Sequence, residues 1–260
     1  MAGDGIARDG IRPGDVVVVT GGGGGFGRAF CRRFARDGAR VAVWDIDTEL
    51  GEEAAREARA EGGEARFFKA DLAQAAELDA AVKATLDVYG SPYCVINNAS
   101  IFPRASVLDM QPEVWEHTLK VNITAPWLIV RAFGPGMIAN KRGVVINIAS
   151  GRALEGAVNG ASYACSKAAI LSLTKTLALE WAKHGIRVNA IIPGVSLTAQ
   201  PLANTTPEEL IERGRATIPL GRLGYPDDMA GLAAYLASAD AAYMTGQGIA
   251  MNGGRVLVPQ

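Results

Sequence analysis

The sequence contains few of the residues that build disulfide frameworks or metal centres. Its 260 residues include three cysteines and two histidines. Cys31, Cys94 and Cys165 are odd in number, far apart and form no CxxC motif. This usage argues against disulfides and metal-binding thiolates, and is typical of small core residues in a reducing cytoplasm. His117 and His184 lie in polar, helix-like stretches, so we expect plain surface roles for both and predict no metal site.

The chain also lacks an excess of charge of either sign and any long apolar run. Its formal net charge is −1, whereas nucleic-acid and acidic-membrane partners favour a basic surface. Runs such as "WLIV" and "GVVINIA" are far shorter than the ~20 residues of a membrane span. The opening "MAGDGIARDGIRPGD" has no apolar stretch typical of a secretory signal. We therefore predict a cytoplasmic location, with neither nucleic acid nor membrane as a partner.

What is present is a regular alternation of apolar, strand-like runs with helix-like segments. The seven strand-like runs are 15–20, 40–45, 64–71, 93–99, 143–150, 186–192 and 248–252. Strands that read as continuous apolar runs, separated by helices, indicate a parallel sheet covered on both faces. The pattern predicts an α/β, doubly wound fold of about seven strands. It forms a single domain over 14–260, after a loose N-terminal segment 1–13.

Glycine is abundant, and five glycines are consecutive in "TGGGGGFG", residues 20–27. Each glycine inside a helix or strand costs roughly 0.5–1 kcal/mol relative to alanine, so this stretch is a loop. It follows the first strand and opens the first helix. There a glycine-rich turn lets the backbone approach a pyrophosphate, and the helix N-terminus offers unpaired N–H groups. A flexible turn is the alternative, which this position makes less favourable.

The spacing Thr20-Gly21-x-x-x-Gly25-x-Gly27 resembles the glycine motif of the short-chain dehydrogenase/reductase family. Other stretches are similar to the family's motifs and occur in its order, from Val16 to Gly254. "NNAS" (97–100) is similar to NNAG, with Ser100 in place of the last glycine. The others are "VNIT" (121–124), "NIAS" (147–150), "YACSK" (163–167), "PG" (193–194) and "TGQ…NGG" (245–254). The resemblance implies a Rossmann-type, nicotinamide-binding oxidoreductase.

The resemblance also assigns roles within the glycine loop. It implies that Gly21, Gly25 and Gly27 are the positions the fold needs, with Phe26 among the cofactor contacts. Gly22 to Gly24 fill the variable part of the motif, so we expect them to make the loop pliant without being individually required.

Tyr163 and Lys167 are candidates for acid/base chemistry. A tyrosine has an ordinary pKa near ~10, too high for a base at neutral pH. A lysine four residues later lies on the same helix face, and its ammonium favours tyrosinate. Tyr163 would then exchange the hydroxyl proton of the substrate. An isolated Tyr-Lys pair is more often a surface contact, but here it accompanies Ser150, Asn122 and the glycine loop.

The remaining catalytic roles come from the resemblance. It implies that Lys167 also binds the nicotinamide ribose and that Ser150 hydrogen-bonds the substrate oxygen. Asn122 would hold a water that connects the lysine to solvent.

Asp45 decides the predicted cofactor. It ends the second strand about 20 residues after the loop, where an acid accepts hydrogen bonds from the adenosine ribose. A 2′-phosphate would be repelled there, and Ile46 is not basic, so we predict NAD. The alternative is that Asp45 only caps the next helix, although Asp47 or Thr48 is better placed. The remaining cofactor contacts implied by resemblance are Asp71, Leu72, Asn98, Ala99, Pro193, Gly194 and Thr198, with Ile192 beside the nicotinamide.

The substrate pocket should form where the segments near Ser150 and Tyr163 meet. The expected apolar wall residues are Ile101, Phe102, Leu154, Val195 and Leu197. Arg152 either clamps a carboxylate or polar oxygen, or pairs with Glu155 at the rim. The stretch 195–218 is predicted to be a mobile lid. These features favour a compact secondary alcohol or ketone with a second polar group.

The sequence therefore predicts an NAD-dependent oxidoreductase that interconverts a secondary alcohol and a ketone. Two alternatives stay open: an NADPH-linked 3-oxoacyl carrier-protein reductase, and a dinucleotide-binding sensor without turnover. The segments 111–139 and 161–184 carry broad apolar surfaces, and the chain ends in "VLVPQ". Such surfaces mark interfaces, and members of the family commonly form tetramers, so we predict a homotetramer.

Overall fold

Seven strands form one parallel sheet in the order β3-β2-β1-β4-β5-β6-β7. The computed structural model describes residues 10–198 and 205–255. Within them the strands are β1 Val16–Thr20, β2 Arg40–Asp45, β3 Glu64–Lys69, β4 Cys94–Asn97, β5 Gly143–Ile148, β6 Ile186–Pro193 and β7 Gly248–Met251. The order reverses direction at β1 and β4, where ligands bind in open α/β sheets.

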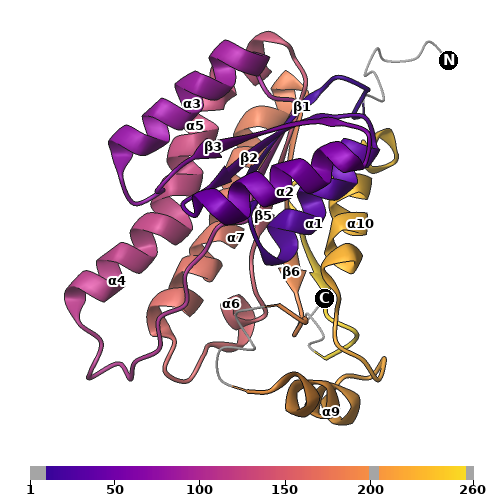
Figure 1. Cartoon of the computed structure of the whole chain (residues 1–260). Coiled ribbons are helices and arrows are strands. Elements are labelled where there is room, and N and C mark those ends of the chain that lie inside the picture. Colours follow the sequence, from indigo (N-terminus) through magenta and orange to yellow (C-terminus); the bar gives the residue numbers. More distant parts are fainter. Residues whose placement is uncertain (1–9, 199–204, 256–260) are drawn as a thin grey trace, which may run out of the picture.

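Helices cover both faces of the sheet, which confirms the predicted doubly wound fold (Figure 1). The bounds are α1 Gly25–Arg36, α2 Thr48–Ala60, α3 Ala75–Tyr89, α4 Pro112–Leu119, α5 Ala125–Ala139, α6 Arg152–Glu155, α7 Ala161–Trp181, α9 Pro207–Thr217 and α10 Pro226–Ala237. A π-helix spans Lys120–Thr124, and 3₁₀ turns span Ala182–His184 and Ala239–Ala241. Helices α1, α2 and α10 pack on one face, and α3, α5 and α7 on the other.

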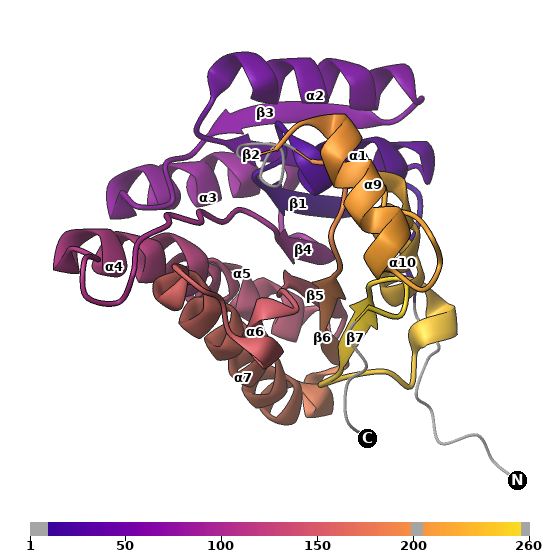
Figure 2. The same cartoon turned by 90° about the horizontal axis from the view of Figure 1, so that it is seen from below.

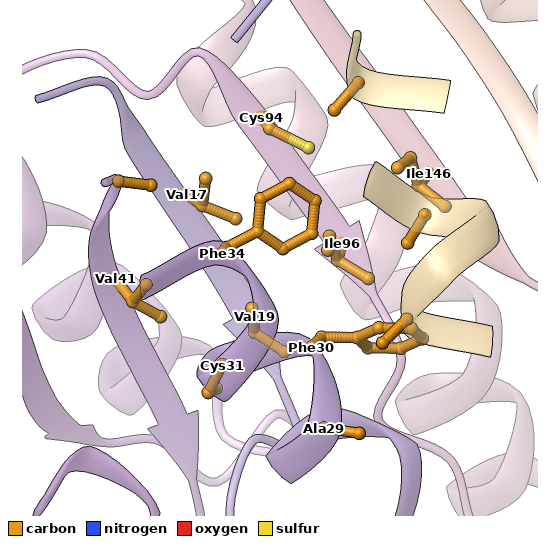
Figure 3. Packing of buried hydrophobic residues seen from close by; sticks show 14 of the residues in the cluster. Val17, Val19, Ala29, Phe30, Cys31, Phe34, Val41, Cys94, Ile96 and Ile146 are labelled. Carbon is orange, nitrogen blue, oxygen red and sulfur yellow. The ribbon is translucent and has the colours of Figure 1, made fainter. Parts of the chain in front are cut away.

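The continuous apolar run of β1 is explained by burial on both sides. Val17 and Val19 face Phe30 and Phe34 of α1 (Figure 3). Val16 and Val18 belong to the core of the opposite face. Fully burying a side chain of this size contributes roughly 1.5–3 kcal/mol, so both cores hold the central strand in place.

The long helix predicted over 111–139 is interrupted. Between α4 and α5 the chain forms a π-helix, in which the Ala125 N–H bonds back to the Lys120 carbonyl. Pro126 has no N–H to donate to the Asn122 carbonyl four residues earlier. This π-helix contains Asn122, the residue that the "VNIT" motif singled out. π-Helical turns are frequent at functional sites.

The predicted boundary of the loose N-terminal segment is also corrected. The Ile11 N–H donates to the Ala237 carbonyl at 3.0 Å, and the Ile11 side chain packs against the core. The packed domain therefore includes residues from Gly10 onward. Residues 1–9 and the C-terminal "VLVPQ" (256–260) lie outside the described residues.

Two of the three cysteines are core residues, as predicted. Cys31 and Cys94 are buried, whereas Cys165 is exposed on α7 and corrects the expectation of a third core thiol. Within the described ranges no helix has the length and apolar character to cross a membrane.

Candidate active site

A cavity of about 910 Å³ opens at the carboxyl ends of the strands. It collects most of the residues that the motifs singled out. From that set the lining includes Gly21, Gly25, Phe26, Asp45, Ile46, Asp71, Leu72, Asn98, Ala99, Ser150, Tyr163, Lys167, Pro193, Gly194 and Thr198. Residues separated by more than 170 positions therefore share one space. His117, for which we expected a plain surface role, is exposed but also lines this cavity.

The three motif glycines are sterically constrained. Gly21 and Gly25 have φ angles of +61° and +50°, a region that residues with a Cβ rarely adopt. A Cβ on Gly27 would lie 1.9 Å from the Gly21 carbonyl oxygen. Gly27 does not line the cavity; it lets α1 approach the loop closely.

Two of the three glycines between the motif positions, Gly22 and Gly23, are also crowded by side chains of β2. A Cβ on Gly22 would lie 2.7 Å from Cγ1 of Val43, and one on Gly23 would lie 2.9 Å from Oδ2 of Asp45. Nothing lies within 4 Å of a Cβ on Gly24. The bare loop is thus needed against β2 as well as toward the cavity.

Thr20 and Asn98 join the loops that follow β1 and β4. The Thr20 hydroxyl accepts hydrogen bonds from the N–H groups of Asn98 and Ala99, at 3.0 and 3.1 Å. The Asn98 amide donates to the carbonyls of Thr20 and Gly21, at 2.9 and 3.0 Å. Thr20 carries no predicted role of its own, although its place at the end of a buried strand, directly before a glycine, is a signal for such a contact.

The start of α1 fits a phosphate group. Its N-cap, Gly24, provides no side-chain hydrogen bond, and the first turn contains no acidic residue. The first N–H groups of a helix lack partners within the helix, and its dipole favours an anion there. Gly24, Gly25 and Phe26 all line the cavity, so a pyrophosphate can reach this end of the helix.

Asp45 lies in the same cavity and is not a helix cap. Its carboxylate accepts the N–H of Gly23 at 2.8 Å and that of Asp47 at 3.0 Å. Asp47 caps α2 by accepting the Leu50 N–H at 3.0 Å, which excludes the capping alternative for Asp45. Ile46 is exposed at the rim.

Tyr163 and Lys167 lie one turn apart on α7 and are both buried. Nζ of Lys167 is 5.6 Å from the centroid of the Tyr163 ring and donates to the Ile148 carbonyl at 2.8 Å. Burial lowers the pKa of Lys167 to about 7. Phe102 stacks on Tyr163, with ring centroids 4.2 Å apart and planes tilted by 15°.

Asn122 lies behind this pair and does not line the cavity. Its side chain accepts the N–H of Ile101 and donates to the Ile101 carbonyl, both at 2.9 Å. It also donates to Oγ of Ser166 at 3.0 Å, and Ser166 donates to the Tyr163 carbonyl at 2.7 Å. Asn122 therefore joins the loop after β4 to the turn of α7 that carries Tyr163. Ser166, inside the "YACSK" motif, was not identified from the sequence.

Hydrogen bonds between buried side-chain amides join the ends of β4 and β5. Asn97 donates to Oδ1 of Asn147 at 2.8 Å, and Asn147 donates to Oγ1 of Thr174 at 2.9 Å. These two hydrogen bonds link β4 and β5 to α7. Ser150, three residues after Asn147, lines the cavity and accepts the Arg152 N–H at 3.2 Å.

A second cavity, of about 390 Å³, continues from the first beyond Ser150 and Tyr163. Of the predicted substrate residues, Ile101 lines the larger cavity, Phe102 both, and Arg152 and Val195 the smaller. Leu154 is 43% exposed and lines neither. The Arg152–Glu155 ion pair, at 3.4 Å, is present, and Arg152 also lines the smaller cavity, where contact with a substrate stays a prediction.

The predicted lid contains a well-formed helix. In α9, Thr206 and Glu209 form a reciprocal capping box, and Leu210 is fully buried. Leu197 packs in the cluster around Leu210 and does not line the pocket, which corrects its predicted role. Residues 199–204 lie outside the described residues. Figure 2 looks onto this end of the molecule and shows α6 and α9 in front of the sheet.

No group of three or more His, Cys, Asp or Glu residues that could hold a metal ion occurs within 10–198 and 205–255. Polar side chains that line the larger cavity include Asp45, Asp71, Ser150, Tyr163 and Lys167.

Comparison with known proteins identifies the family. A family model described as "Enoyl-(Acyl carrier protein) reductase" matches residues 22–255. The chain is 35% identical over 248 residues to 2-(S)-hydroxypropyl-CoM dehydrogenase 3 of Xanthobacter autotrophicus, covering 94% of this chain and 97% of that protein. The chain belongs to the short-chain dehydrogenase/reductase family.

Other members of the short-chain dehydrogenase/reductase family are equally similar. Galactitol 2-dehydrogenase of Agrobacterium fabrum is 36% identical over 249 residues, covering 92% of this chain and 96% of that protein. A solved structure from Beutenbergia cavernae, assigned as an NAD(P)-dependent gluconate 5-dehydrogenase, superposes with a TM-score of 0.88. It is 39% identical, the match covers 94% of this chain and 97% of that one, and NADP is bound at low occupancy. The protein is thus an oxidoreductase with the nicotinamide-dinucleotide fold of short-chain dehydrogenases/reductases.

Proposed function

We propose that the protein is an NAD-dependent dehydrogenase that interconverts a secondary alcohol and a ketone. The observation that carries the proposal is the buried Tyr163–Lys167 pair, with Ser150, in a cavity that continues to the glycine loop and Asp45. The dehydrogenase relatives named above for hydroxypropyl-CoM and galactitol support an alcohol as substrate class.

Tyr163 is the proposed acid/base group. In the oxidation direction its phenolate oxygen takes the hydroxyl proton of the substrate, and Oγ of Ser150 holds the same oxygen by a hydrogen bond. A bound nicotinamide ring supplies the hydride acceptor. In the reverse direction Tyr163 returns the proton to the forming alkoxide. Phe102, stacked on the phenol ring, restricts its orientation.

Lys167 is proposed to act on Tyr163 through its charge and to hold the nicotinamide ribose. Its ammonium favours the tyrosinate form and so lowers the pKa of the phenol. Because burial lowers the pKa of Lys167 to about 7, the free protein loses this ammonium as pH rises through neutrality. The ribose hydroxyls, as added acceptors, would favour the charged form. Asn122 and the π-helix around it are proposed to hold a water on the path from Lys167 to solvent.

NAD is the proposed cofactor, because the Asp45 carboxylate would repel a 2′-phosphate. Gly21, Gly25 and Phe26 would face the pyrophosphate, Asp71, Leu72, Asn98 and Ala99 the adenosine, and Pro193, Gly194 and Thr198 the nicotinamide half. The NADP in the Beutenbergia structure keeps an NADP-linked activity, including a 3-oxoacyl carrier-protein reductase, as the second candidate. A location in the cytoplasm, proposed from the cysteine content, suits a dehydrogenase that exchanges NADH with a shared pool.

Replacement of Tyr163 tests the mechanism. Secondary alcohols are oxidised with NAD or NADP while absorbance at 340 nm is followed. Tyr163→Phe retains the ring that stacks on Phe102 but loses the exchangeable proton, so kcat should fall by about 10²- to 10⁴-fold. Dinucleotide affinity, measured by NADH fluorescence, should change little. A variant within tenfold of wild type contradicts the role of Tyr163, and a wild type without turnover favours the sensor alternative.

A further inference from the structure

The smaller cavity is strongly basic. Four arginines line it, and Glu155 is the one carboxylate among its lining residues within the described ranges. The arginines are Arg104, Arg152, Arg213 and Arg255. The larger cavity shares Arg104 and is also lined by Lys167, but it contains both Asp45 and Asp71. Positive charge is therefore concentrated at one end of a protein whose formal net charge is −1.

Three of these arginines form no ion pair within 4.0 Å among the described residues, although Arg213 interacts electrostatically with Glu209 one turn earlier on α9. Only Arg152 forms an ion pair, with Glu155 at 3.4 Å. Arg104 lies over the Phe102 ring, 5.0 Å from its centroid. Four guanidinium groups around one cavity with a single carboxylate can bind an oxyanion by paired hydrogen bonds.

The smaller cavity adjoins the side chains that are proposed to act on the substrate hydroxyl. It shares Phe102, Ser150 and Tyr163 with the larger cavity. The arginines come from four places: the loop after β4, the start of α6, the helix α9 and the turn after β7. A substrate whose hydroxyl contacts Ser150 and Tyr163 can therefore extend into this space.

We propose that the substrate carries an oxyanion (a carboxylate, sulfonate or phosphate) a few bonds from its carbinol carbon, and that the smaller cavity binds it. This inference rests on the proposed function. Glu155 can hold the Arg152 guanidinium at the rim while the other N–H groups of that guanidinium face the anion. Pairing with Glu155 and binding of the substrate are therefore compatible. Arg213, on α9, lines the cavity and forms no ion pair within 4.0 Å among the described residues, so its guanidinium can bind the anion.

Paired substrates test the charge requirement. Hydroxy acids, hydroxysulfonates and hydroxyalkyl phosphates, with one to four carbons between carbinol and anion, are each compared with a neutral ester or amide. We expect at least one anionic member to exceed its neutral partner in kcat/KM by about tenfold or more, as charged hydrogen bonds allow. Neutral partners that equal every anionic member would overturn the inference.

Arg213→Ala identifies the receptor, with Arg215→Ala as its matched control on the same helix. Arg215 pairs with Glu212 at 3.8 Å and is not among the residues that line either cavity. Arg213→Ala should lower the anionic-to-neutral ratio of kcat/KM by about tenfold, whereas Arg215→Ala should keep it within about twofold. Arg213→Lys should restore part of the ratio. Equal ratios in both alanine variants would contradict the assignment.

A binding measurement separates this inference from the proposed function. Acetate, methanesulfonate and inorganic phosphate are titrated by calorimetry into wild type, Arg213→Ala and Arg152→Ala. We expect at least one of these anions to bind wild type and to lose at least about tenfold in affinity in Arg213→Ala. If no alcohol is turned over but this pattern appears, the dehydrogenase activity is wrong and the anion site stands. If neutral alcohols are oxidised and no anion binds, the anion site is wrong.

Discussion

Lys167 shows how burial of a single residue sets a pH dependence. It is 2% exposed, and its amine has one hydrogen-bond acceptor from the described backbone, the Ile148 carbonyl. Burial removes water from the ammonium and so lowers its pKa from 10.5 to about 7. Below pH 7 both the folded and the unfolded chain carry the proton. Between pH 7 and 10.5 the unfolded chain binds more protons, so the free energy of unfolding should rise with pH.

Lys167→Met isolates this contribution. The difference in free energy of unfolding, wild type minus variant, should increase above pH 7 by up to about 1.4 kcal/mol per pH unit. Urea unfolding of the cofactor-free proteins between pH 6 and 9 measures it. A difference that stays constant from pH 7 to 9 would show that the folded protein keeps Lys167 protonated.

Asp45 is expected to determine the cofactor. In Asp45→Ala combined with Ile46→Arg, the carboxylate is lost and a guanidinium is gained where a 2′-phosphate would lie. The ratio of kcat/KM for NAD over NADP should fall by about tenfold or more. Asp47→Ala is the control, because Asp47 caps α2 and does not line the cavity. A wild type that prefers NADP would contradict the proposal.

At the residue scale, motifs located the cavity but not the contacts behind it. Asp45 is identified by its place at the end of a strand after the glycine loop, and Tyr163 and Lys167 by their four-residue spacing in the "YACSK" motif. Thr20 and Ser166 act through hydrogen bonds to residues 78 and 44 positions away. Such contacts depend on how strands and helices meet in space, which local spacing does not contain.

The loop between β1 and α1 packs closely against the start of α1 at one glycine and not at another. Gly27 lies against the Gly21 carbonyl, whereas Gly24 faces open space. Gly27→Ala should lower the free energy of unfolding by about 1–3 kcal/mol or more, because the loop and helix must separate. Gly24→Ala should remain within about 0.5 kcal/mol, since its backbone is extended and nothing opposes the methyl group. Thermal unfolding without cofactor compares them; equal effects would contradict the role of close packing.

Element types were predictable from periodicity, but two interruptions were not. The π-helix arises because Pro126 removes a donor one turn after Asn122, and both residues lie in a stretch with continuous helical periodicity. In the predicted lid, the capping box of Thr206 and Glu209 is a local start signal for α9 that the prolines and threonines of 195–218 obscured. The burial of Leu210 then depends on contacts made elsewhere in the fold.

At the scale of the whole molecule, the doubly wound parallel sheet and its two-faced core were predictable from the continuous apolar strands, whereas the order of the strands was not predicted. The apolar faces of the outer helices remain partly uncovered in the single chain. Trp127 on α5 is 45% exposed and Leu179 on α7 is 84% exposed. Exposed apolar groups on neighbouring helices are typical of subunit contacts.

These faces support the proposed homotetramer. Light scattering after size-exclusion chromatography should give a mass four times that of the 27.2 kDa chain. Leu179→Glu should lower that mass by adding charge to the contact. A wild-type monomer at every concentration would refute the tetramer.

The strand order also divides the chain into two parts that can change independently. Strands β1 to β3 end by Lys69, and their loops carry Gly21, Asp45 and Asp71. Every lining residue of the smaller cavity comes after position 100. Recombination between related genes with a junction in the connection from α3 to β4 would therefore exchange one ligand preference and leave the other intact. Thr20 and Asn98 lie on opposite sides of this junction, so both parent proteins of such a hybrid would have to form the hydrogen bonds that join them.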